Sequence, residues 1–190
     1  MSVIMLNKDK DLAEQFLYLV PGEFRKYCED EAVVKLGAAY AEEDGIVAAG
    51  IVIAEFSAQK VNIKWLFTDP DYRGRGAGEE LLGKIFEMAR MNGIDKVAAE
   101  VPSFGENYVH ESGMAGFLTE YFFNYVDKIE ADGMSKFVLE APNNGDVLAQ
   151  IAAGKEIQAR EETAREYDSF PNKFTVTEVE YYSGVAIDEQ

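Results

Sequence analysis

The sequence predicts an α/β (α+β) fold in which helices flank a mixed, largely antiparallel β-sheet. Three observations support this prediction: two helical segments come first, an acidic turn then joins two apolar strands, and a strand–loop–helix–strand unit follows. Hydrophobic residues make up 47% of the chain, which is normal for a globular protein. Because 190 residues suffice for one domain with its own core, we expect residues 1–190 to form a single domain.

The first third of the chain is expected to supply a strand, two helices and a hairpin. Apolar residues recur at helical spacing in two segments that Pro21-Gly22 separates. Two apolar runs then flank Glu-Glu-Asp-Gly, which is typical of a hairpin turn. The expected elements are a strand at 3–6, helices at 8–20 and 23–31, and strands at 33–41 and 46–56.

A glycine-rich turn joins an apolar strand, residues 61–68, to an amphipathic helix, residues 79–90. The turn contains Gly74, Gly76 and Gly78. At such a turn, backbone N–H groups and the positive end of the helix dipole are exposed. Glycines also allow a ligand to approach the main chain closely. The arrangement therefore favours binding of a phosphate or pyrophosphate.

Two other glycine-loop motifs do not fit this turn. A P-loop ends in Gly-Lys-Ser/Thr, whereas Gly78 is followed by two glutamates. A dinucleotide-binding fingerprint requires a glycine where Arg73 stands. Arg73, Gly76 and Gly78 do fit the pattern Arg-x-x-Gly-x-Gly/Ala, which follows a strand and a Pro. This pattern resembles the acetyl-coenzyme A loop of the GNAT superfamily of N-acetyltransferases, most specifically over residues 61–101.

The resemblance implies a GNAT-type fold, in which strand 61–68 and a parallel strand at 94–101 splay apart to form the acetyl-CoA cleft. It implies transfer of an acetyl group from acetyl-CoA to a primary amine of an unidentified acceptor. Backbone N–H groups near Phe67 and Thr68 would polarise the thioester carbonyl. The implied cofactor-binding residues are Phe67, Thr68, Arg73, Gly74, Arg75, Gly76, Ala77 and Gly78.

Many members of the family carry a tyrosine on a helix that is followed by Gly-Phe, and this tyrosine would protonate the leaving thiolate. One alignment places the helix at residues 108–114 and offers Tyr108. The other, which we prefer because its period is clearer, places Tyr121 and Tyr125 on one face of a helix over residues 117–129. Neither has Gly-Phe in the expected place. The alternative function is therefore a catalytically weak or inactive acyl-CoA-binding or regulatory module.

Three carboxylates are candidates for the base that deprotonates the amine. Glu100 ranks first because it lies in an otherwise apolar strand, where an unpaired carboxylate would be costly. Glu55 and Asp69 are the other two, and Asp69 also suits the start of a turn before Pro70.

Composition limits the partners and the setting of the protein. The net charge of −17 repels nucleic acid and anionic membranes and favours a cationic small-molecule acceptor, such as an amine. No apolar run approaches the roughly 20 residues of a membrane span. With Cys28 as the single cysteine and His110 as the single histidine, we expect no disulfide and no metal site. A cytoplasmic location is the default expectation.

The last part of the chain, residues 142–190, reads as a helix–strand extension. A turn at residues 142–145 precedes an expected helix at 146–167 and a final strand or hairpin at 174–187. The charged helix could cover the acceptor site, form a homodimer contact or remain a solvated appendage. The sequence leaves these three alternatives open.

Overall fold

The computed structural model describes residues 1–43, 45–102 and 113–156. The strands are β1 (Ser2–Met5), β2 (Val34–Glu42), β3 (Gly45–Phe56), β4 (Val61–Thr68), β5 (Lys96–Pro102), β6 (Asn124–Ala131) and β7 (Met134–Pro142). The helices are α1 (Lys10–Glu14), α2 (Arg25–Glu29), α3 (Ala77–Met91) and α5 (Gly113–Glu120), and residues 146–156 are also helical. Short 3-10 turns are η1 (Leu6–Lys8), η2 (Leu17–Leu19), η3 (Gly22–Phe24) and η4 (Pro70–Tyr72).

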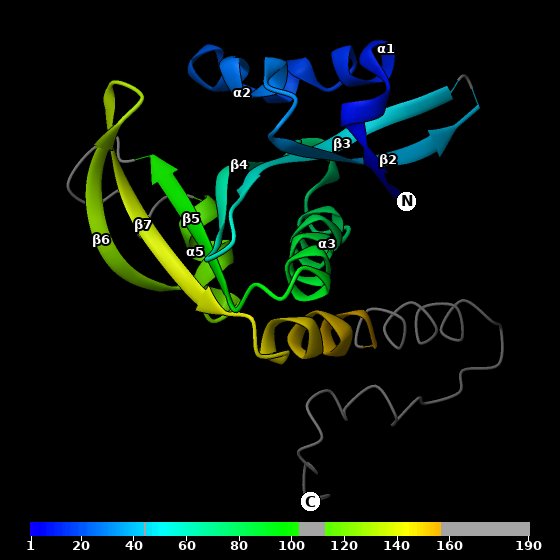
Figure 1. The fold of residues 1–190 in the computed structure, drawn as a ribbon. Coiled ribbons are helices and arrows are strands. Elements are labelled where there is room, and N and C mark those ends of the chain that lie inside the picture. Colours follow the sequence, from blue (N-terminus) through cyan, green and yellow to red (C-terminus); the bar gives the residue numbers. More distant parts are fainter. Residues whose placement is uncertain (44, 103–112, 157–190) are drawn as a thin grey trace, which may run out of the picture. The chain divides into compact units, whose positions relative to one another are not determined.

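The strands form one seven-stranded sheet in the order β1-β2-β3-β4-β5-β7-β6 (Figure 1). All neighbouring strands are antiparallel except β4 and β5, which are parallel. The predicted mixed, largely antiparallel sheet is thereby confirmed. The chain divides into two compact units, residues 1–147 and 148–190, and the sheet belongs entirely to the first.

Helices cover both faces of the sheet, with α1 and α2 on one side of β2 to β4 and α3 on the other (Figure 1). The apolar stripe of α3 is buried, as its spacing predicts. On the opposite face, Phe16, Leu19 and Phe24 pack in one core cluster with Ile51 and Ile53 of β3. Burial of each large apolar side chain stabilises the fold by about 1.5–3 kcal/mol. The buried members of the α3 stripe are Leu81, Leu82, Ile85, Phe86 and Ala89.

The N-terminal helices are shorter than predicted, because the chain bends to bury Phe16. Its ring lies against Gly37 of β2, where an added Cβ would be only 2.4 Å from the Phe16 ring. Only residues 10–14 of the first predicted helix are α-helical, and the remainder bends into η2. In the second, η3 leads directly into α2.

The helix predicted over residues 117–129 is wrong beyond Glu120. Helix α5 ends there, and β6 begins at Asn124 and turns back into β7. Asp132 and Gly133 link these strands with positive φ angles of 57° and 75°. This is the backbone of a two-residue type I′ turn, for which Asp-Gly is a preferred sequence. The dipeptide therefore closes the β6–β7 hairpin, within a region where the apolar period had predicted a helix up to residue 129.

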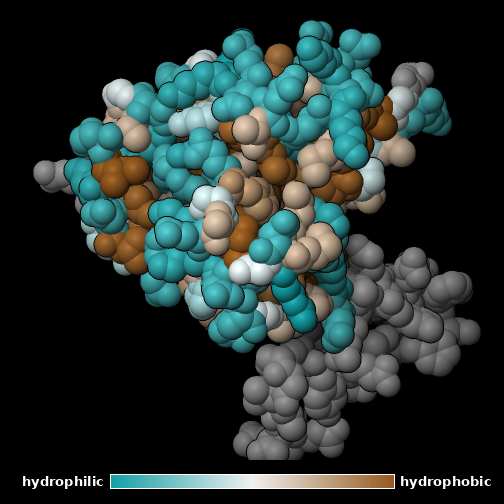
Figure 2. Space-filling model, viewed as in Figure 1, coloured by the Kyte–Doolittle hydropathy of each residue, from teal (hydrophilic) through white to brown (hydrophobic). Residues whose placement is uncertain are grey.

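The surface seen in Figure 2 is mostly hydrophilic, in keeping with the strongly charged composition. Hydrophobic residues gather in the middle of this face, over the region where β4, β5 and α3 meet in Figure 1. In the part of the chain that the structure describes, no helix is long and apolar enough to cross a membrane.

Candidate active site

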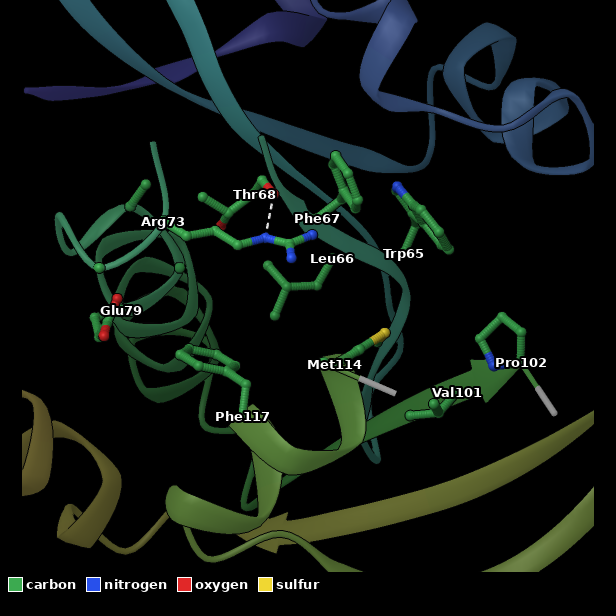
Figure 3. A pocket seen from close by; sticks show the side chains of 14 residues that line it. Trp65, Leu66, Phe67, Thr68, Arg73, Glu79, Val101, Pro102, Met114 and Phe117 are labelled. Carbon is green, nitrogen blue, oxygen red and sulfur yellow. Dashed lines mark hydrogen bonds between the residues drawn. The ribbon is translucent and has the colours of Figure 1, made fainter. Parts of the chain in front are cut away.

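A cleft opens where β4 and β5 diverge. The two strands pair only over Val61–Ile63 and Val97–Ala99, and no pairing follows toward their carboxyl ends. A cavity of about 400 Å³ lies beyond that point (Figure 3). It is lined by Trp65, Leu66, Phe67 and Thr68 of β4, Arg73 and Gly74 of the turn, Ala77, Gly78 and Glu79 of α3, Val101 and Pro102 of β5, and Gly113, Met114 and Phe117 of α5. The predicted splay of the two strands is therefore present.

The glycine turn brings the N-terminus of α3 to this cavity. Gly74 and Gly76 have φ angles of 72° and 83°, a left-handed conformation that glycine adopts without steric cost. Gly76 is the N-cap residue of α3, and its carbonyl accepts a hydrogen bond from Glu80 N at 3.0 Å. The first N–H groups of a helix have no intrahelical partner. The turn and the start of α3 therefore offer donors and a positive dipole end to an anion.

Helix α5 forms the third wall and packs closely on the start of α3. A Cβ added at Gly78 would lie 3.2 Å from the Phe117 ring and 3.5 Å from Thr68 Oγ1. Met114 and Phe117 project from α5 toward the cavity (Figure 3). Neither was predicted as a site residue. Their helical spacing marked an apolar face, but nothing in the sequence indicated that this face borders a cavity.

The two arginines of the turn have different surroundings. Arg73 Nε donates a hydrogen bond to Thr68 O at 3.2 Å, and its guanidinium lies 5.7 Å from the Phe67 ring centre (Figure 3). Arg75 stacks on Tyr72 at 5.2 Å and does not line the cavity. Its carbonyl accepts a hydrogen bond from Tyr40 Oη at 2.9 Å. The positive charge at the cleft therefore comes from Arg73.

Strand alternation identifies the amides of β4 that face the cleft. Asp69 N donates to Ala49 O of β3 at 2.9 Å, and the register continues as Thr68–Gly50 and Phe67–Ile51. Because the direction of N–H groups alternates along an antiparallel strand, Phe67 faces β3, as Asp69 does. Leu66 and Thr68 then present their N–H groups to the opposite edge of β4, where β5 is no longer paired with it. Leu66 was not predicted as a site residue, because only the strand register shows which of two neighbouring residues points its N–H group toward the cleft.

The predicted tyrosines are not brought together. Tyr121 directly follows α5, and its ring lies 5.0 Å from that of Phe117, behind the cavity wall. Burial raises the pKa of Tyr121 to about 12, with Glu79 contributing. Tyr125 lies on β6, 56% exposed, with its ring against Phe137. Tyr108 lies outside the described residues, as does His110.

Phe122-Phe123 occupies the place where Gly-Phe is expected after the helix. Phe122 has a φ of 64°, the left-handed conformation that favours glycine. Phe123 is buried and meets Phe86 of α3 edge-on at 6.0 Å. The chain therefore leaves α5 through a left-handed residue at Phe122, and Phe123 packs the turn against α3.

None of the three candidate carboxylates lines the cavity. Glu100 accepts hydrogen bonds from Lys64 Nζ at 2.6 Å and Lys136 Nζ at 3.1 Å. Burial alone would raise the pKa of Glu100, but these two partners lower it below its usual value. Glu55 pairs with Lys64 at 3.1 Å, and Asp69 accepts from Asp71 N and Tyr18 Oη. A paired carboxylate of low pKa is a weak base, so the geometry favours another role for Glu100.

Comparison with known proteins agrees with this geometry. The model of the acetyltransferase (GNAT) family matches residues 6–110, more than half of the chain. A comparison with curated proteins found no match.

Several solved structures share the fold. An aminoglycoside 6'-N-acetyltransferase from Enterococcus faecium aligns with a TM-score of 0.57 and 12% identity, covering 75% of this chain and 97% of its own. The PaiA N-acetyltransferase of Thermoplasma acidophilum, solved with coenzyme A, aligns with a TM-score of 0.52 and 17% identity over 75% and 99% of the two chains. The chain spans 65% of the length of a nourseothricin acetyltransferase, with a TM-score of 0.45, 20% identity and 58% of this chain covered.

Proposed function

The chain belongs to the acetyltransferase (GNAT) family of acyltransferase enzymes, and we propose that it moves an acetyl group from acetyl-CoA to a primary amine. One observation carries this proposal. The glycine turn at the start of α3 and the unpaired edge of β4 open into the same cavity between β4 and β5. An anionic group at the helix N-terminus and an extended arm along the strand edge could then belong to one ligand.

Coenzyme A has both parts. Its pyrophosphate suits the N–H groups from Gly74 to Gly78 and the charge of Arg73, and its pantetheine arm suits the edge of β4 at Leu66 and Thr68. The PaiA N-acetyltransferase of Thermoplasma acidophilum, which shares the fold, was solved with coenzyme A. That protein is too distant to transfer an acceptor to this chain.

The chemistry requires little covalent help from the protein. The neutral amine nitrogen attacks the thioester carbon to form a C–N bond, and the C–S bond breaks. The nitrogen then loses a proton to give the amide, and the leaving thiolate takes up a proton to give the thiol. Holding the two reactants in line accounts for much of the rate. The N–H groups of Leu66 and Thr68 would stabilise negative charge on the carbonyl oxygen. Tyr121 keeps its proton at neutral pH because burial raises its pKa to about 12, but it lies behind the Phe117 ring and does not line the cavity. The proposed proton donor to the thiolate is therefore either Tyr121, if its hydroxyl comes within hydrogen-bond reach of the sulfur, or a water molecule.

The cationic acceptor follows from charge alone. With a net charge of −17, the field of the protein as a whole attracts cations. A small-molecule amine is therefore the proposed acceptor. We also propose that the protein forms a homodimer.

The test is release of free thiol from acetyl-CoA in the presence of a panel of amines, with the acetylated amine identified by mass spectrometry. We expect thiol and acetyl-amine to appear in equal amounts. The matched control is the Gly76→Val variant, which keeps every ionisable group. Coenzyme A binding without transfer to any amine would instead support the inactive binding module.

A further inference from the structure

A buried ion pair bridges β4 and β5 where their backbone pairing stops. The last paired residues are Ile63 and Ala99. The next residue on each strand is Lys64 and Glu100, and Lys64 Nζ lies 2.6 Å from Glu100 Oε1. Both residues are more than 90% buried. A side-chain ion pair therefore replaces the backbone ladder at the base of the cleft.

Lys64 also marks the point at which β4 changes direction. The β3–β4 register passes from Ala54–Ile63 to Ile53–Trp65, so Lys64 is an extra residue without a partner in β3. An extra residue of this kind is a β-bulge, which bends a strand and increases its twist. Paired strands lie about 4.8 Å apart, whereas long Lys and Glu side chains bridge a wider gap. The bulge turns β4 away, and the ion pair spans the gap that results.

Glu100 is held from the other side by β7. Lys136 is completely buried, and its Nζ lies 3.1 Å from Glu100 Oε2. Asn62 of β4 donates a further hydrogen bond to Glu100 Oε1. Both carboxylate oxygens are therefore fixed, one toward each neighbouring strand. Lys136 continues the chain of contacts to Asp132, which Lys26 and Tyr27 of α2 also contact.

We propose that Lys64, Glu100 and Lys136 are positioning residues that set how far β4 and β5 splay, and so place the β4 edge against the thioester arm of coenzyme A. The inference rests on the proposed acetyl-CoA site, because it assigns a role within that cleft. None of the three lines the cavity, so they act through Trp65 to Thr68 on one strand and Val101 on the other.

The energetics of buried ion pairs favour a geometric role. Replacing such a pair by apolar residues of similar size is often neutral or stabilising, because removing charges from water is costly. Three buried charges at the fork are thus poorly explained by stability. An apolar pair would also allow the strands to close, whereas an ion pair with fixed partners holds one separation.

The experiment compares variants at the fork with variants of a more exposed ion pair at the paired end of the sheet. Glu100→Gln and Lys64→Met remove a charge at the fork with little change in size. The matched controls are Glu140→Gln and Lys96→Met, because Lys96 of β5 and Glu140 of β7 form an ion pair at 2.9 Å away from the cleft. Each variant is assayed for coenzyme A affinity by calorimetry, for acetyl-CoA KM and kcat, and for thermal unfolding.

We expect the fork variants to lose up to about a hundredfold in acetyl-CoA kcat/KM, the cost that a misplacement of about 1 Å can reach, and to bind coenzyme A more weakly than wild type. The controls should change by less than about twofold, since exposed pairs contribute little. Lys64→Arg, which keeps the charge, should restore affinity relative to Lys64→Met.

Two results would overturn the inference. The first is unchanged coenzyme A affinity in a folded Lys64→Met or Glu100→Gln variant. The second is a loss of affinity that only follows a loss of thermal stability and disappears when binding is measured well below the unfolding midpoint. If wild type itself fails to bind coenzyme A, the proposed function is wrong rather than the geometry of the fork.

Discussion

Replacing Gly76 by valine should abolish most of the affinity for coenzyme A. Gly76 has a φ of 83° at the N-cap of α3, and this conformation orients the N–H groups proposed to hold the pyrophosphate. A left-handed conformation costs an L-residue about 1–2 kcal/mol, and a β-branched one is a genuine outlier there. If the variant relaxes to a negative φ, binding must first restore the turn, and this cost alone corresponds to about 5–30-fold weaker binding. The valine methyl groups also add bulk in the turn next to Ala77, which lines the cavity.

The matched control for this variant is Gly93→Val, at the other end of the same helix. Gly93 has a φ of 66°, and a Cβ added there would meet no atom within 4 Å. It therefore suffers the same backbone strain without touching the cleft. We expect both variants to unfold at a lower temperature and only Gly76→Val to lose affinity for coenzyme A in calorimetry. Equal affinity of wild type and a folded Gly76→Val would refute the assignment of the turn to the cofactor.

Three further predictions concern the reaction and the stability of the fold. If the field of the protein steers a cationic acceptor, the acceptor KM should rise with ionic strength, and a preference for acidic or neutral acceptors would contradict this. If a tyrosine is the general acid, replacing it by phenylalanine should lower kcat by about 10²–10⁴-fold and leave the affinity for coenzyme A unchanged. If Tyr108→Phe, Tyr121→Phe and Tyr125→Phe all turn over like wild type, water is the acid. Burial alone would raise the pKa of Asp132, but its contacts with Lys136, Lys26 and Tyr27 lower that pKa to about 2. The ionised Asp132 therefore stabilises the fold above about pH 4, and this stabilisation is lost as the pH falls toward about 2. The unfolding free energy of Asp132→Asn should therefore depend less on pH between about pH 2 and about pH 4 than that of wild type. The same pH dependence in both proteins would exclude this contribution.

The elements around the glycine turn were predictable because local signals agree there. The strand at 61–68 matches β4 residue for residue, and the predicted glycine turn leads into α3, with Gly74 and Gly76 in the left-handed conformation. The helix predicted over residues 117–129 was wrong because two signals disagree there: apolar residues recur at helical spacing, but Asp132-Gly133 favours a hairpin turn. Phe117 and Tyr121 suggested a continuing helix, but the left-handed Phe122 ends it and Asp132-Gly133 closes a hairpin. The Asp-Gly pair should have outweighed the period.

The partners of Glu100 could not be predicted in the same way. The sequence indicated that a carboxylate in an apolar strand needs compensation, which is correct. Lys64 and Lys136 each lie 36 residues away along the chain, and only the register of β4 and β7 against β5 brings them to it. The same reason explains why Leu66, rather than Phe67, presents its amide to the cleft.

A crystal structure of the protein with coenzyme A tests the proposed site most directly. We expect the pyrophosphate within hydrogen-bond distance, about 3 Å, of backbone N–H groups between Gly74 and Gly78. We also expect the pantetheine arm between β4 and β5, hydrogen-bonded to the cleft-facing edge at Leu66 and Thr68. Coenzyme A bound elsewhere, or β4 and β5 paired along their full length in the complex, would contradict the proposed site.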